Sequence, residues 1–251
     1  MFDRYSNETK NEMHRSFEDD LDKVRTRLIR MGSLVEEQVE FAFRSMLECN
    51  TALAEIVIER DDKVDKLDLK IDKHCQRLFA LHQPVASDLR LLLAALKINN
   101  ELERIGDTAV DVARVCQNVP TCRDMSESLG LERITKAAFT MVKASLDAFI
   151  NHDLALAKQI LPTDDTVDNL EKDITRELIG MMQQNVHLIE PGVKVISALR
   201  SIERMTDHAT NIAENVIFLF EARLVRHRHF EDDELVEGLN LNDDAESETD
   251  A

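Results

Sequence analysis

The chain has 251 residues, of which 43% are apolar and only 4% aromatic, and it holds six glycines and four prolines. This composition can bury one large core or two small ones, and it disfavours a strand-rich sandwich, which needs aromatic residues and frequent turns. The formal net charge is −18, but residues 231–251 carry ten acidic side chains and no lysine or arginine, so residues 1–230 carry only −8. A mildly acidic body argues against direct nucleic-acid binding as the main task.

The cysteine spacing and the hydropathy indicate the cellular compartment in which the protein is expected. The four cysteines form no C-x-x-C pair, which is typical of reduced thiols in a cytoplasmic protein rather than of a disulfide or zinc framework. No apolar run approaches the roughly 18 residues that a membrane span requires, and the charged N-terminus leads into no apolar segment. We therefore expect a protein that is neither exported nor membrane-spanning.

Three amphipathic helices are predicted in the first part of the chain. Apolar residues three and four positions apart predict helices over about 21–49 and 52–83, the second ending before a proline. A third helix is expected over 88–119, with Asp88 as its N-cap. Together these helices define a first domain, residues 10–118.

The pattern then pauses and restarts. Residues 119–130 contain a proline, two serines and a terminal glycine, which favours a linker. The same helical spacing resumes at Ile134, continues past Pro162 and runs to about Arg226, which predicts a second domain over 131–228. Residues 229–251 are predicted to form an acidic, disordered tail, because so few apolar side chains cannot offset the entropy of ordering.

The chain contains an internal repeat. The stretch ERIGDTAVDVA at 103–113 returns as ERMTDHATNIA at 203–213, one hundred positions later, and residues 61–68 match 164–171 at a constant shift of 103. Helical repeats with short connections pack as antiparallel bundles. We therefore predict an all-α fold made of two tandem three-helix bundles.

Rows of carboxylates follow this repeat at helical spacing. In the first repeat, Glu103, Asp107 and Asp111 lie opposite the apolar stripe of their helix, and Asp61, Asp65 and Asp68 flank the stripe of the preceding helix. In the second repeat the corresponding residues are Glu203 and Asp207, with Asp164, Asp168 and Glu171. Asn211 stands where the first repeat has Asp111.

Two interpretations of these rows are open. They are either the solvated faces of helices in an acidic protein or clusters of hard oxygen ligands for magnesium, calcium, manganese or iron. Like charges four residues apart are mildly destabilising, so their recurrence at equivalent positions favours metal binding. Arg104 and Arg204 each precede an aspartate by three residues, which favours an ordinary ion pair over a phosphate-binding role.

Catalytic motifs are absent from the sequence. There is no Gly-rich phosphate loop, no G-x-S-x-G and no dinucleotide fingerprint. The scattered histidines form no repeated Glu-x-x-His pairs, so the di-iron oxidase arrangement of helical bundles is not supported. We therefore expect no enzymatic activity, and a carboxylate-bridged, multinuclear metal-binding protein or metalloenzyme is the alternative.

Three stretches, residues 83–92, 101–107 and 200–214, resemble the signature of the PhoU family of phosphate-transport accessory proteins. The resemblance spans about residues 10–230 and implies two three-helix bundles, a cytoplasmic location, frequent homodimerisation and metal clusters on paired E/D-x-x-x-D motifs. Iron, zinc, magnesium or manganese would be the metal. It also implies a negative regulator of the phosphate-starvation response that couples the ATPase subunit of a phosphate ABC importer to a sensor histidine kinase. Contact with the membrane would then come only through these partners.

Overall fold

The computed structural model describes residues 2–119 and 122–222, and every regular element within those ranges is helical. The first bundle consists of α1 (Phe2–Glu48), α2 (Thr51–His82) and α3 (Ala86–Asn118). The second consists of α5 (Glu132–Asn151) with its short continuation α6 (Leu154–Ile160), α7 (Asp164–Gln184) and α8 (Ile189–Glu221). Two 3-10 turns, η1 (Leu161–Thr163) and η2 (Val186–Leu188), lead into α7 and α8. The predicted all-α architecture of two helical bundles is confirmed.

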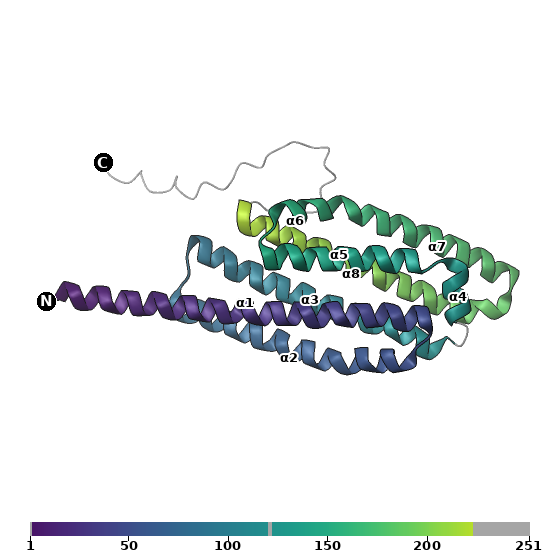
Figure 1. Ribbon diagram of the computed structural model, residues 1–251, viewed down its shortest axis with the longest axis horizontal. Helices are drawn as coiled ribbons and strands as arrows, with labels where there is room; N and C mark the ends of the chain where they lie inside the picture. Colours follow the sequence, from purple (N-terminus) through teal and green to yellow (C-terminus); the bar gives the residue numbers. More distant parts are fainter. Residues whose placement is uncertain (1, 120–121, 223–251) are drawn as a thin grey trace, which may run out of the picture.

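The two bundles lie side by side. Figure 1 shows α1, α2 and α3 in one layer and α5 to α8 in the other, and α3 and α8 form the most extensive helix pair of the molecule. The apolar stripes predicted for α3 and α8 are buried, including Ile105 and its repeat counterpart Met205, both with no exposed area. One core therefore runs continuously through both bundles.

The repeat extends to the helix ends. Cys49 and His152, 103 positions apart, both adopt the left-handed conformation (φ 55° and 56°). The next residue in each case is an N-cap. The side chain of Asn50 accepts a hydrogen bond from the amide of Leu53 at 3.2 Å, and that of Asp153 accepts one from the amide of Leu156 at 2.9 Å. Each bundle thus makes its first sharp turn with the same two local devices, a left-handed residue followed by a side-chain cap.

Several predicted helix boundaries were wrong. α1 begins at Phe2 rather than near residue 21, and the N-cap of α3 is Val85, with Asp88 inside the first turn. Pro191 also lies in the first turn of its helix, α8, where its missing amide hydrogen removes no helical hydrogen bond. α8 ends at Glu221, and the predicted acidic tail lies outside the described residues.

The segment predicted as a linker is largely helical. Within 119–130, α4 spans Cys122–Leu129, and it buries Met125 and Leu129 to 3% and 1% exposure. Of the residues that indicated a loop, Pro120 precedes α4 and Gly130 follows it in the left-handed region at φ 60°, whereas Ser126 and Ser128 lie within the helix. No helix within the described ranges has an apolar stretch sufficient to cross a membrane.

Candidate functional site

The carboxylates of the first repeat meet where α2 packs against α3. Asp61 and Asp68 on α2 and Glu103 on α3 are half-buried in this seam, whereas Asp65 and Asp107 are exposed at its edge. The sequence placed the Glu103 row on the face opposite the core, and this is corrected for Glu103, whose side chain is only 25% exposed. The row begins inside the helix pair and turns outward along α3.

Burial sets the electrostatics of this group. It raises the pKa of Asp61, Asp68 and Glu103, and neighbouring carboxylates raise each pKa further. The charge of Asp107 acts on both Asp61 and Glu103, across and along the helix pair. A half-buried group of mutually repelling carboxylates favours binding of protons or cations.

Two buried amides support the first group, and the sequence analysis missed both. Gln38 of α1, fully buried, donates to Asp61 Oδ1 at 3.0 Å, and Asn99 of α3 donates to Asp68 Oδ1 at 2.6 Å. These bonds oppose the effect of burial on the carboxylate pKa values. A polar residue inside an apolar helical stripe, such as Gln38 between Val35 and Val39, is the signal that could have identified them.

Asp111 does not join this group. Its exposed carboxylate pairs with Arg114 at 3.2 Å and reaches Arg204 of the other bundle at 3.6 Å. The predicted pair between Arg104 and Asp107 is present at 3.9 Å. Arg204, in contrast, bridges the two bundles.

The carboxylates of the second repeat meet between α7 and α8. Burial raises the pKa of Glu203, and all four other predicted residues of the cluster add to the effect: Asp207, Asp168, Glu171 and Asp164. Leu199, which is fully buried, occupies the position that Asn99 holds in the first bundle, so the second cluster lacks the counterpart of that amide.

Asn211 has a different role from Asp111. Its amide donates to Glu101 Oε2 at 3.2 Å, and His208 Nδ1 lies 2.7 Å from the same oxygen. The sequence analysis assigned no role to Glu101 or His208. Together they form a polar contact between α3 and α8, so this part of the repeat joins the bundles.

Each cluster has a buried carboxylate oxygen that accepts no hydrogen bond from the described residues. These oxygens are Glu103 Oε2, which lies 3.5 Å from Arg104 Nε, and Asp168 Oδ1. Within residues 2–119 and 122–222, no three His, Cys, Asp or Glu side chains are arranged as they stand to hold a metal ion. Paired hard oxygens of this kind nevertheless fit a divalent or trivalent cation chemically.

The fold and these clusters define a class: a two-domain, all-helical protein with half-buried carboxylate groups repeated in each domain. The PhoU domain matches residues 28–116 and again residues 131–216. The chain therefore belongs to the PhoU family.

Relatives are similar over most of their length. A phosphate-specific transport system accessory protein PhoU homolog of Pseudomonas aeruginosa is 40% identical over 214 residues, covering 84% of this chain and 88% of the relative. The accessory protein PhoU of Escherichia coli K12 is 33% identical over 211 residues, covering 84% of this chain and 88% of its own.

Crystal structures show the same fold. PhoU from Pseudomonas aeruginosa has a TM-score of 0.78 at 38% identity, over 82% of this chain and 100% of that one. The phosphate transport system regulatory protein PhoU from Streptococcus pneumoniae has a TM-score of 0.76 at 26% identity, over 84% of this chain and 99% of that one.

Proposed function

We propose that this chain is a non-enzymatic, cytoplasmic regulator of phosphate homeostasis that represses the phosphate-starvation response when phosphate is plentiful. It would do so by contact, coupling the ATPase subunit of a phosphate ABC importer to a sensor histidine kinase, and would function as a homodimer. The observation that carries this proposal is the pair of PhoU domains, which together span most of the chain. The relatives that share both domains are accessory proteins of phosphate-specific transport systems.

The exposed apolar residues support a contact role. The two most exposed of the large apolar side chains lie at helical hairpin tips, with Val85 72% exposed at the α2–α3 tip and Val186 69% exposed at the α7–α8 tip. Figure 1 places these two connections at opposite ends of the molecule. Two separate apolar tips on stiff helical pairs suit a protein that contacts two partners.

Deletion of the gene from its host tests this proposal. Alkaline-phosphatase-type activity should rise in phosphate-rich medium, and the intact gene should restore repression. A Val186→Ser copy and a Val85→Ser copy, each checked for folding by circular dichroism, should each lose capture of one partner. The proposal fails if the deletion strain keeps the starvation genes silent in rich phosphate.

A metal-binding role is a second candidate, favoured by two buried oxygens that accept no hydrogen bond from the described residues, Glu103 Oε2 and Asp168 Oδ1. In the first bundle the metal would be held by Glu103, Asp107, Asp61, Asp65 and Asp68. In the second it would be held by Glu203 and the four carboxylates around it, Asp207, Asp164, Asp168 and Glu171. Bound iron, zinc, magnesium or manganese would supply positive charge that neutralises the repulsion between the carboxylates. A metal-dependent turnover by the purified protein would favour the metalloenzyme alternative.

Replacement of Glu103 and Asp107 together by alanine tests the metal role. We expect loss of the first-bundle metal, measured by elemental analysis, with an unchanged helical circular-dichroism signal, because the change removes repelling charges rather than core contacts. Glu59→Ala with Asp62→Ala, two exposed acids of α2, is the matched control and should retain the metal. Equal metal content in both double variants would contradict this assignment.

A further inference from the structure

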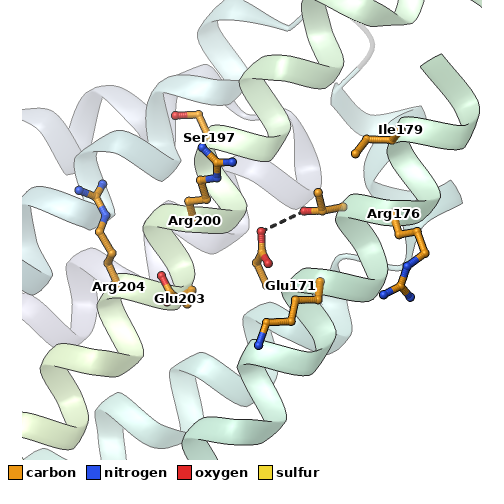
Figure 2. Close-up of a pocket in the computed structure, with 9 residues that line it drawn as sticks. Glu171, Arg176, Ile179, Ser197, Arg200, Glu203 and Arg204 are labelled. Carbon is orange, nitrogen blue, oxygen red and sulfur yellow. Dashed lines mark hydrogen bonds between the residues drawn. The ribbon is translucent and has the colours of Figure 1, made fainter. Parts of the chain in front are cut away.

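The second bundle carries a groove lined by both basic and acidic side chains. It lies between α7 and α8, with a volume of about 850 Å³. Four basic side chains line it, Lys172, Arg176, Arg200 and Arg204, against the acidic Glu171 and Glu203. Figure 2 shows the side chain of Arg200 beside Ser197 on α8. A groove with more positive than negative lining is unusual in a chain whose body is acidic.

Three of the four basic groups already have carboxylate partners. Lys172 pairs with Asp168 at 3.6 Å, Arg176 with Asp173 at 2.8 Å, and Arg204 with Asp111 at 3.6 Å. The guanidinium of Arg200 has no ion-pair or hydrogen-bond partner within residues 2–119 and 122–222. Its five donors are therefore available to a ligand in the groove.

The two repeats differ at this point. Asn100 stands one hundred positions before Arg200, and Asp72 stands 103 positions before Thr175. Asp72 accepts a hydrogen bond from Gln76, whereas Thr175 donates one to Glu171 at 3.0 Å. Relative to the first bundle, the second has thus lost one negative charge and gained one positive charge at the same place. The exchange makes this part of the second bundle more basic than the equivalent part of the first.

We propose that this groove binds a phosphate-bearing anion, held by the guanidinium of Arg200 with the exposed hydroxyl of Ser197 as a second donor. The planar fork of an arginine matches two phosphate oxygens at once. The volume exceeds that of a single phosphate ion and is typical of small-molecule sites, and Ile179, 42% exposed, offers an apolar wall. Free phosphate and a phosphate monoester both offer the negatively charged oxygens that the guanidinium of Arg200 would bind. The proposal is independent of the regulatory role.

Isothermal titration calorimetry of the full-length chain tests the site, with inorganic phosphate, glycerol 3-phosphate and succinate as probes. Arg200→Asn installs the residue of the first repeat and should weaken binding of both phosphate ligands at least about tenfold, the loss expected for a charged hydrogen-bonded contact. Arg30→Asn removes an exposed arginine of α1 and should leave binding unchanged. Circular dichroism should show both variants fully helical.

The probes distinguish the sources of the anion. Tighter binding of glycerol 3-phosphate than of inorganic phosphate identifies an ester as the ligand class, and the reverse order identifies the free ion. The proposal is overturned if neither phosphate ligand binds, if Arg200→Asn binds them as the wild type does, or if succinate binds as tightly. Because these outcomes are measured on purified protein, they are separate from the gene-deletion result.

Discussion

Glu203 is a residue at which burial and charge repulsion act together. Its half-buried carboxylate faces four others, and burial and their charges together raise its pKa. In the first bundle, by contrast, the buried amides of Gln38 and Asn99 donate to Asp61 and Asp68 and partly stabilise their charged forms. The metal-free protein therefore loses stability at Glu203 when this group ionises.

We predict that Glu203→Gln stabilises the metal-free protein at neutral pH. A carboxyl with a raised pKa in the folded state binds more protons there than in the unfolded state. Its ionisation therefore lowers stability as pH rises from the ordinary value of 4.5 through the raised folded pKa. A gain of 1 kcal/mol corresponds to about 2–4 °C in Tm at this chain length. Thermal melts at pH 7.5 should show the gain.

The same melts below pH 4.5 should show no difference between Glu203→Gln and the wild type, because both side chains are then neutral. The control is Glu177→Gln, which replaces an exposed acid of α7 and should not reproduce the pH-dependent gain. A constant offset at all pH values would mean that the substitution acts through packing or helix propensity instead.

Residue spacing predicted which carboxylates meet but not how deeply they lie. The four-residue periodicity brought Asp61 and Glu103 to the same helix pair. Their burial depends on the distance between α2 and α3, and helical periodicity alone does not predict that distance. The spacing also could not predict that Asp111 lies apart from the cluster, because its partner Arg204 belongs to the other bundle.

At the scale of elements, two glycines show how closely the helices approach. A Cβ added at Gly32 of α1 would lie 3.0 Å from Leu146 Cδ2 of α5, at the contact between the bundles. A Cβ at Gly106 of α3 would meet Asp61 Oδ1 at 3.4 Å, which is an ordinary van der Waals distance. The first position is tight, whereas the second has room.

We predict opposite outcomes for alanine at these two positions. Gly106→Ala should raise the free energy of unfolding by about 0.5–1 kcal/mol, because alanine is the better helix former and its methyl group fits. Gly32→Ala should leave it at or below the wild-type value, because Leu146 must move. Urea denaturation of both variants measures this difference. A gain of similar size in both would show that α1 and α5 are less tightly packed than described.

Element boundaries show what local sequence signals can and cannot predict. The Asn50 and Asp153 turns follow from local cap chemistry. The helix α4 within 119–130 was missed because its stability comes from burying Met125 and Leu129 against the bundles, and a pattern of eight residues is too short to reveal this. Tertiary packing overrode the turn-forming residues within and beside this helix.

At the scale of the whole molecule, the most extensive contact between helices, that of α3 with α8, joins the two bundles. α3 and α8 pack along the seam, where Glu101 accepts from Asn211 and lies within hydrogen-bond distance of His208. Lys143 of α5 also reaches Glu36 of α1 at 2.8 Å. An interface this extensive and this apolar at its centre couples the stability of one bundle to that of the other.

We predict that residues 2–222 unfold in one cooperative transition, although the repeat suggests two units. Leu78→Ala in the first bundle and Leu199→Ala in the second each remove a fully buried side chain and should cost about 2–5 kcal/mol. If the bundles are coupled, each variant lowers the Tm of the entire calorimetric transition, and the ratio of calorimetric to van't Hoff enthalpy stays near one. Independent bundles would instead give two peaks, of which Leu78→Ala shifts only one and Leu199→Ala only the other. That result would mean that α3 and α8 touch without sharing their stability.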